Sequence, residues 1–394
     1  MKVDPYHSDR TYKDWKEETE SVGISGLSKT NCKLLLEYIN DMETGQNIAR
    51  GSKKGARSYT RLNALRVKLI FLFRTLEERG IHNSAKTKEK EINSLFDDMR
   101  KGVIKKINGE TYKSVGDYVK DFKSFWHWLI KVNKKKDIEI QDITEDLDTS
   151  KEENTFVYFT KDELEKMLPY FTPDEQTMML FMFDTIIRSP TELMNVRISD
   201  VASDLSEATI RDETSKTYGR TIKLLLCKDA LKEYLKRNSD IKSNEYLFQF
   251  SAPYFNRKLK KVSDQVFEGR STKGGKSFAE LSMYDFRHSG ACHWRTGAYR
   301  SKIDALMYRG GWSNLEMLNY YTKKLGMKDS IEKDDLLVGL DKTELEKEID
   351  RLKRERDYER ELNEKKMKVF EEKLNSMETR FRRNLSQSAQ KVKA

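Results

Sequence analysis

Apolar residues recur at helical spacing along this chain, and this periodicity constrains its fold more than any other feature. Over residues 62–76 they step by three and four positions, and the stretch ends at Gly80, as a helix with a C-cap does. A second stripe of the same kind covers residues 115–130. With only 5 Pro and 19 Gly in 394 residues, few positions interrupt such helices. The sequence therefore predicts a mainly helical protein.

The first part of the chain is expected to be a leader, residues 1–20, followed by a small helical bundle, residues 21–135. Two basic segments within it, residues 52–61 and 101–113, interleave Lys and Arg with hydroxyl and amide side chains, which suits contacts with phosphate groups. An ordinary solvated surface is the simpler alternative, because charged residues cover most helices of soluble proteins.

A polar stretch, residues 136–155, is interpreted as a linker to a second domain, residues 156–332. That domain opens on Thr160, which is spaced from Glu163 as in a capping box at the start of a helix. Residues 208–226 flank a turn-rich centre with β-favouring residues and predict a β-hairpin. The predicted fold class is therefore mainly α with a small β-hairpin (α+β).

A highly charged tail, residues 333–394, closes the chain. Its apolar residues fit heptads in two registers, offset as if by a four-residue stutter, with polar residues between them. A self-associating coiled coil is one interpretation, and a single exposed helix or partial disorder is the other.

The charge balance indicates a polyanionic partner. The chain has 75 Lys and Arg against 65 Asp and Glu, a net charge of +10 and a pI near 9.1, so nucleic acid is the first candidate and an anionic membrane surface the second. No apolar run approaches the roughly 20 residues that span a bilayer, and no secretory signal opens the chain. We therefore expect a soluble, cytoplasmic protein.

Three cysteines, Cys32, Cys227 and Cys292, lack CxxC spacing and are odd in number. They indicate neither a disulfide framework nor a zinc module, and we expect them to be buried as small apolar residues.

Five candidate chemical residues follow one another in the second domain. Taken singly, each has an ordinary explanation as a surface or core residue. They are Arg188 in FDTIIRSPTELMNVRISDV, Lys216 in TSKTYGRTIKL, Arg287 in LSMYDFRHSGACHW, Trp312 in YRGGWSN and Tyr321 in NYYTKK. Their order and spacing make the combination far more specific than its parts.

In these segments the chain resembles the tyrosine recombinase (phage integrase) family, including its archaeal and mobile-element integrases, over about residues 155–325. The family's first box is matched by Arg188, Glu192-Leu193, Val196-Arg197 and Asp200. Its second box, usually His-x-x-Arg-His, reads Tyr284-Asp285-Phe286-Arg287-His288. Its third box, a Gly-Trp pair nine residues before the nucleophile, is matched by Gly311-Trp312 and Tyr321-Thr322. The N-terminal bundle is compatible, less specifically, with the family's core-binding domain.

The resemblance implies an enzyme that cuts and rejoins DNA without a metal or cofactor, with Tyr321 as the nucleophile. Arg188 and Arg287 would offset the charge that builds on the phosphate oxygens, because guanidinium groups bind them bidentately. Attack would leave a 3′-phosphotyrosine, and Lys216 would give a proton to the departing oxygen. The indole N–H of Trp312 could also donate to the phosphate. The phosphotyrosyl ester keeps the energy of the broken bond, so rejoining needs no ATP.

Two departures from the family pattern stand out. Arg188 precedes Glu192 by four residues where three is commoner, so the turn must accommodate one more residue, through Pro190. Tyr284 replaces the usual His, and a phenol cannot serve as an imidazole-like acid or base near neutral pH, although it can donate a hydrogen bond to phosphate. His288 could compensate in part, but its family counterpart is more often structural.

Tyr321 is preferred over Tyr320 as the nucleophile, because its distance from Trp312 and the Thr that follows it match the family. Tyr320 is then a packing residue.

The leading interpretation is a site-specific recombinase of a mobile element, cytoplasmic and nucleoid-associated, that would assemble as a tetramer on paired double-stranded DNA sites. Two alternatives stay open. A type IB topoisomerase shares the nucleophile and fold, but the small helical N-terminal domain disfavours it. A non-catalytic DNA-binding protein of the same fold is the second alternative, because Tyr284 stands in place of the usual His.

Overall fold

The computed structural model describes residues 3–49, 54–150, 155–296 and 302–324, together with 349, 351–354, 356–357, 360 and 367 in the tail. The chain divides into two compact units, Met1–Gly326 and Met327–Ala394. The predicted heptads of the tail lie largely outside the described residues.

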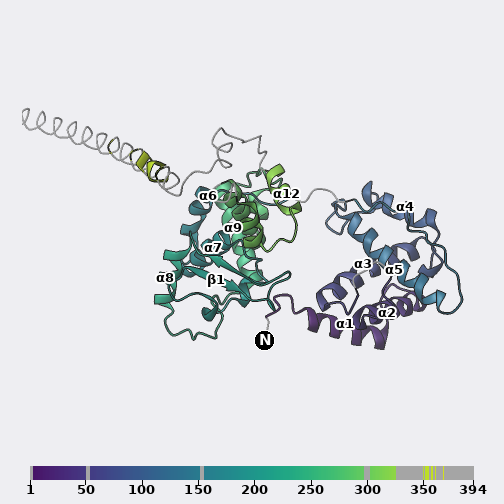
Figure 1. Ribbon diagram of the computed structural model, residues 1–394. Coiled ribbons are helices and arrows are strands. Elements are labelled where there is room, and N and C mark those ends of the chain that lie inside the picture. The colour runs from purple at the N-terminus through teal and green to yellow at the C-terminus, as the bar shows by residue number, and fades with distance from the viewer. Residues whose placement is uncertain are drawn as a thin grey trace, which may run out of the picture. The chain divides into compact units, whose positions relative to one another are not determined.

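Helices make up the N-terminal bundle of the first unit (Figure 1). They are α1 (Ser8–Val22), α2 (Lys29–Thr44), α3 (Tyr59–Glu78), α4 (Glu89–Arg100) and α5 (Val115–Lys134), with a short 3-10 turn, η1 (Ser84–Lys86). The two apolar stripes of the sequence fall on α3 and α5, so both predicted helices are confirmed.

The core of the bundle follows directly from these stripes, because leucines of α3 and aromatic residues of α5 are buried in one cluster. Segments outside the predicted bundle also contribute to it. Tyr12 of α1 is buried there, within the predicted leader, as are Ile143 and Leu147 from the polar stretch after α5.

The second half of this unit is built mainly from helices as well. Its elements are α6 (Lys161–Met167), η2 (Leu168–Tyr170), α7 (Pro173–Thr185), η3 (Leu193–Asn195), η4 (Ile198–Asp200), β1 (Glu207–Ile210), β2 (Arg220–Lys223), α8 (Lys228–Arg237), α9 (Ala252–Phe267), η5 (Phe278–Glu280), α10 (Met283–Thr296), α11 (Ile303–Gly310) and α12 (Glu316–Lys324).

Two local predictions in this half are confirmed. The Thr160 hydroxyl accepts from the backbone N–H of Glu163 and the Glu163 carboxylate accepts from that of Thr160, which completes the capping box that starts α6. Strands β1 and β2 pair antiparallel, with Ala208 opposite Ile222. They form the two-stranded sheet of the described residues, so the fold is mainly α with a small hairpin.

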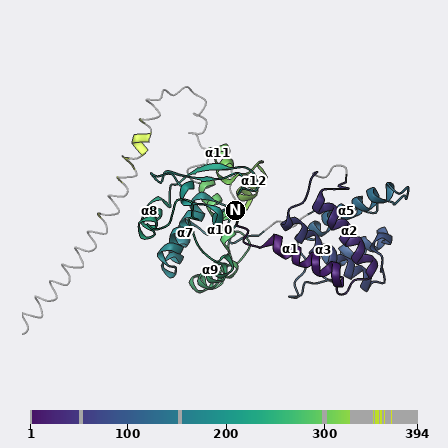
Figure 2. The same cartoon turned by 90° about the horizontal axis from the view of Figure 1, so that it is seen from below.

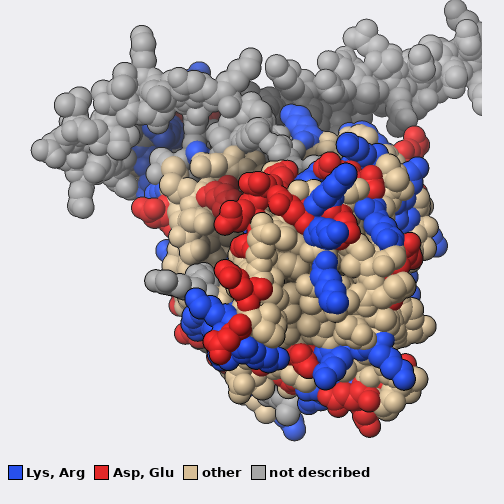
Figure 3. Space-filling view, turned by 90° about the vertical axis from the view of Figure 1, so that its right-hand side faces the viewer, with Lys and Arg blue, Asp and Glu red and all other residues tan. Residues whose placement is uncertain are grey.

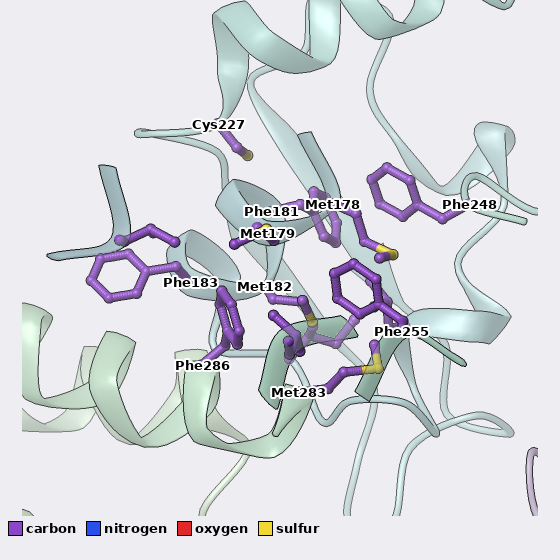
Figure 4. Close-up of a cluster of buried hydrophobic side chains, with 14 of the residues drawn as sticks. Met178, Met179, Phe181, Met182, Phe183, Cys227, Phe248, Phe255, Met283 and Phe286 are labelled. Atoms are coloured by element: carbon purple, nitrogen blue, oxygen red, sulfur yellow. The ribbon is translucent and has the colours of Figure 1, made fainter. Parts of the chain in front are cut away.

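Helix α7 lies at the centre of this half and packs against α8 and α10. It is apolar on nearly all sides, as a helix surrounded by protein must be. Figure 4 shows Met178, Phe181 and Met182 of α7 among Phe255 and Phe286 from α9 and α10. Figure 2 shows α7, α9 and α10 gathered in this domain. The three cysteines are buried, as expected.

The surface shows two further properties. Lys and Arg side chains are interspersed with Asp and Glu on the face drawn in Figure 3, so this face carries no continuous block of one charge. Within the described part of the chain, no helix combines the length and apolar character needed to cross a membrane.

Candidate active site

Arg188 lies just beyond α7 and is held in a tight turn by Glu192. The Glu192 carboxylate accepts hydrogen bonds from the backbone N–H of Arg188 at 3.0 Å and from its Nη1 at 2.6 Å. This pair spans the four-residue interval that is one residue longer than the common family spacing. The turn therefore accommodates the extra residue while keeping the guanidinium fixed.

Glu192 also binds Arg220, a fully buried residue at the start of β2. Arg220 Nη2 and Nη1 donate to the two carboxylate oxygens at 2.8 and 3.2 Å, in a fork geometry. Burial alone would raise the pKa of Glu192, but the hydrogen bonds and charge of Arg220, with the charge of Arg188, lower this pKa to about 2. Glu192 is therefore an anion that neutralises one of its two arginines.

The C-terminal end of α11 gathers three guanidinium groups. The carbonyl of Arg309 accepts a hydrogen bond from Arg220 Nε at 2.9 Å. The next carbonyl, of Gly310, accepts from Arg287 Nη2 at 2.5 Å, and that of Gly311 accepts from Arg188 Nη2 at 2.9 Å. Carbonyls at this end of a helix lack intrahelical donors and carry partial negative charge. The helix end thus orients three cations that would otherwise repel one another.

Two glycines make this arrangement possible. Gly311 has a φ of 62°, in the left-handed region, and a Cβ there would lie 3.0 Å from Arg220 Nη1. A Cβ on Gly310 would lie 2.5 Å from the ring of Trp312. The close approach of Arg220 and of Trp312 to this turn therefore requires the Gly-Gly pair.

Arg287 is almost completely buried on α10 and contacts three parts of the domain. Besides Gly310, its Nη1 donates to the carbonyl of Ile186 at 2.6 Å, and its guanidinium carbon lies 4.9 Å from the centroid of the Trp312 ring. Burial and the charge of Arg188 lower the pKa of Arg287 to about 10. The residue remains a cation at neutral pH.

Tyr321, on α12, is fully buried beside these residues. The centroid of its ring lies 5.6 Å from that of Trp312. The Phe156 ring packs edge to face against it, with the centroids 6.3 Å apart. Its hydroxyl forms a hydrogen bond of 3.0 Å with Nδ1 of His288. Burial raises the pKa of Tyr321 well above its usual value, and the nearby charge of Arg287 offsets this only in part. The phenol is therefore neutral in this state.

His288, named from the sequence as a partial compensation for Tyr284, lies beside the nucleophile candidate. It lies on α10 one helical turn after Tyr284, on the same face. The two rings pack edge to face, with their centroids 5.0 Å apart. Tyr284 itself is 44% exposed. Burial, together with the charges of Arg287 and Lys276, lowers the pKa of His288 to about 3, so its imidazole is neutral.

Lys216 lies in the loop between β1 and β2, and its side chain is exposed. The loop is tied to the site by the next residue. Thr217 donates to the carbonyl of Gly311 at 3.0 Å and accepts from Arg188 Nη2 at 3.3 Å.

The structure thus brings four predicted residues together: Arg188, Arg287, Trp312 and Tyr321. It also adds supporting residues that the motifs do not name. Arg220 had one available signal, since it alternates with buried Ile222 on a half-buried strand, which indicates a paired internal charge.

A second buried ion pair supports the same region. Arg309 donates to the carboxylate of Asp184 at 2.5 Å and to the carbonyl of Lys223 at 2.9 Å. Asp184 also accepts from three backbone N–H groups, of residues 225–227, just before α8. This network joins α7, β2, the segment before α8, and α11. No pattern in the sequence predicted it.

Comparisons with known proteins bear on the family and the fold of this domain. Residues 157–326 match the model of the phage integrase family. The chain is similar to a lambda integrase tetramer bound to a Holliday junction, with a TM-score of 0.54, 15% identity and coverage of 76% of this chain and 79% of that one. It is also similar to XerH site-specific recombinase bound to palindromic difH substrate, with a TM-score of 0.52, 15% identity and coverage of 82% and 91%.

A third similar structure is that of the Tn1549 transposon integrase in complex with circular intermediate DNA, with a TM-score of 0.52, 15% identity and coverage of 80% of this chain and 100% of that one. No curated protein sequence matches the chain. The structural likenesses establish the fold, and the family match covers Arg188, Lys216, Arg287, Trp312 and Tyr321. Residues 157–326 therefore form a domain of the phage integrase family, and by that domain the chain is a site-specific recombinase.

Proposed function

We propose that Tyr321 cuts one strand of double-stranded DNA and holds its 3′ phosphate as a phosphotyrosine until another strand takes it. The observation that carries this assignment is the convergence of Arg188 and Arg287 on the end of α11, beside the buried ring of Tyr321. A phosphodiester placed there would meet two fixed cations and a nucleophile in one small site.

The arginines suit the charge that develops during the transfer. A guanidinium carries five N–H donors, and the contacts of Arg287 with Ile186 and Gly310 use two of them. The remaining donors can bind the non-bridging phosphate oxygens, and Trp312 can add its indole N–H. Because protein carbonyls already hold both arginines, little reorganisation is needed when phosphate arrives.

Lys216 is assigned the proton that the departing 5′ oxygen needs. Its loop contacts Gly311 and Arg188 through Thr217, while its own side chain stays exposed and able to reach a bound strand. A lysine ammonium can act as a general acid toward a departing oxygen.

We further propose that four protomers act together on paired sites. The similarity to the lambda integrase tetramer on a Holliday junction supports this assembly. Light scattering of the protein, alone and with duplexes carrying two binding sites, should show a tetramer only with the paired sites. A monomer under all conditions would contradict the assembly without affecting the chemistry.

The chemistry is tested by trapping the covalent intermediate. Duplexes recovered from a random pool by binding to the protein are nicked near the centre of the bound segment, so that cleavage releases a short strand and cannot reverse. The wild type should then give a protein-DNA adduct on a denaturing gel.

Tyr321→Phe should abolish this adduct and Tyr320→Phe should retain it. An adduct with Tyr321→Phe would show that another residue is the nucleophile. If the wild type binds these duplexes and never forms an adduct, the chain is a DNA-binding protein without strand-transfer activity. The deep burial of Tyr321 is the observation that favours this second function.

A further inference from the structure

We propose that His288 is a catalytic residue that takes the proton of Tyr321 as the tyrosine attacks phosphorus. This inference rests on the proposed nucleophile. Its geometric basis is the hydrogen bond of 3.0 Å between Tyr321 Oη and His288 Nδ1. For Nδ1 to accept, the neutral imidazole must carry its hydrogen on Nε2.

The other groups around Tyr321 cannot take this proton near neutral pH. Phe156 has no polar atom, the indole of Trp312 only donates, and the guanidinium of Arg287 is already protonated. Tyr320, whose ring lies 5.5 Å from that of Tyr321, is itself a phenol. Among the described residues whose rings contact Tyr321, only His288 offers a neutral imidazole that can act as a general base.

The position of His288 also accounts for the departure at Tyr284. Residues four apart on an α-helix lie on one face, one turn apart, so an imidazole at 288 projects on the same side of α10 as a side chain at 284. The Tyr284 ring packs edge-on against His288 and limits how the imidazole can turn. Of the two histidines in the family's second box, this chain keeps only the one at position 288, and that imidazole is in direct contact with the nucleophile.

The proton balance of the step closes without another reagent. As the bond from Tyr321 Oη to phosphorus forms, the phenol proton passes to His288 Nδ1, while the bond to the 5′ oxygen breaks and that oxygen takes a proton from Lys216. In the rejoining step a 5′ hydroxyl returns its proton to Lys216, and the departing Tyr321 recovers its own from His288.

The charges around His288 set when this transfer can occur. Arg287 and Lys276 are its cationic neighbours, and Tyr284, Tyr320 and Tyr321 are the phenols that face it. In the free protein these cations disfavour an imidazolium, so the proton stays on Tyr321. A phosphodiester bound between Arg188 and Arg287 brings the negative charge that offsets them. Binding of DNA therefore activates the nucleophile.

The test uses single-turnover cleavage of the nicked duplexes by the full-length protein. His288→Ala should cleave about 100-fold to 1,000-fold more slowly than the wild type, as loss of a general base does. DNA affinity and the circular dichroism spectrum should not change. His293→Ala is the matched control, because His293 is also on α10 but packs against Phe183 and Trp294, away from the nucleophile, and it should cleave normally.

Two measurements separate proton transfer from mere positioning. His288→Asn can still accept a hydrogen bond from Tyr321 but cannot carry its proton, so it should be as slow as His288→Ala. Imidazoles added to His288→Ala should restore cleavage, with rates that rise with the basicity of the imidazole. Wild-type rates for either variant, or a rescue independent of basicity, would overturn the proposal.

A modified substrate distinguishes the two ends of the reaction. Sulfur in place of the 5′ bridging oxygen gives a leaving group that needs no proton, so it should restore cleavage by Lys216→Ala and not by His288→Ala. Restoration of His288→Ala would assign His288 to the leaving group and contradict the proposal. If the wild type itself forms no adduct, the proposed function fails, whereas a normal wild type beside a normal His288→Ala removes only this inference.

Discussion

Arg220 illustrates how a fully buried charge is tolerated in this protein. Its guanidinium donates to both carboxylate oxygens of Glu192 and to the carbonyl of Arg309, so three acceptor oxygens compensate its burial. A buried ion pair of this kind adds little net stability, but removal of one partner leaves an uncompensated charge. The pair is best regarded as a device that fixes the positions of Arg188 and the end of α11.

Replacement of Arg220 should therefore be costly. Arg220→Met is expected to lower the free energy of unfolding by about 3 to 5 kcal/mol and to slow adduct formation, as urea denaturation and the trapping gel would show. Arg237→Met, which removes an exposed pair with Asp174, should cost less than about 1 kcal/mol. Equal effects of the two substitutions would contradict the structural role given to Arg220.

Glu192 should leave a signature in the acid stability of the protein. Its folded-state pKa of about 2 lies below the value of 4.5 expected when unfolded, so its contribution is complete above pH 4.5 and is lost as the pH falls toward 2. The contribution is on the order of 3 kcal/mol. In urea titrations, the stability gap between the wild type and Glu192→Gln should shrink over this range. A constant gap would mean that Glu192 titrates normally.

At the scale of elements, apolar spacing predicted α3 and α5, and turn chemistry predicted the hairpin and the start of α6. These features depend on residues close together in sequence, so local rules suffice. The helix α1 contains few apolar residues, and its Tyr12 is buried in the core of the bundle. Its burial depends on packing against residues far away in sequence.

The candidate site likewise combines residues that sequence motifs predicted with contacts that they did not predict. Order and spacing of motifs located Arg188, Arg287, Trp312 and Tyr321, yet the carbonyl contacts that orient the arginines come from residues about 20 to 120 positions away in the chain. The contact of His288 with Tyr321 could not be predicted from the sequence, because it depends on where α12 places Tyr321. Such contacts follow from the packing of helices and leave no pattern in sequence.

The turn after α11 offers a test at this scale. Gly311→Ala adds a Cβ in a left-handed residue and against Arg220, whereas Gly109→Ala adds one in a left-handed residue with open space around it. The second change should cost about 1 to 2 kcal/mol of backbone strain. The first should cost more and also slow cleavage, as denaturation and the trapping gel would measure. Equal costs would show that the approach of Arg220 does not constrain the turn.

For the whole molecule, the organisation of the cores is the main feature. One buried cluster draws its residues from positions 12–147, and the other two draw theirs from positions 156–321. Since neither set borrows from the other, each part of the chain holds a complete apolar interior.

The two parts should therefore fold separately. Residues 1–150 and 155–326, produced as two proteins, are each expected to show a helical circular dichroism spectrum and a cooperative urea transition. A fragment that gains cooperativity only when mixed with the other would refute their independence.

The three guanidinium groups at the end of α11 have a thermodynamic consequence for the protein that carries them. Glu192 supplies one carboxylate against three cations, so the protein itself holds excess positive charge among buried groups here. Any anion that settles there relieves this repulsion in the native state alone, and by linkage it raises the melting temperature. Sulfate should therefore stabilise the wild type more than Arg188→Met, beyond its general salting effect. The recombinase should therefore resist thermal unfolding best while it is bound to DNA, and least while it diffuses without DNA.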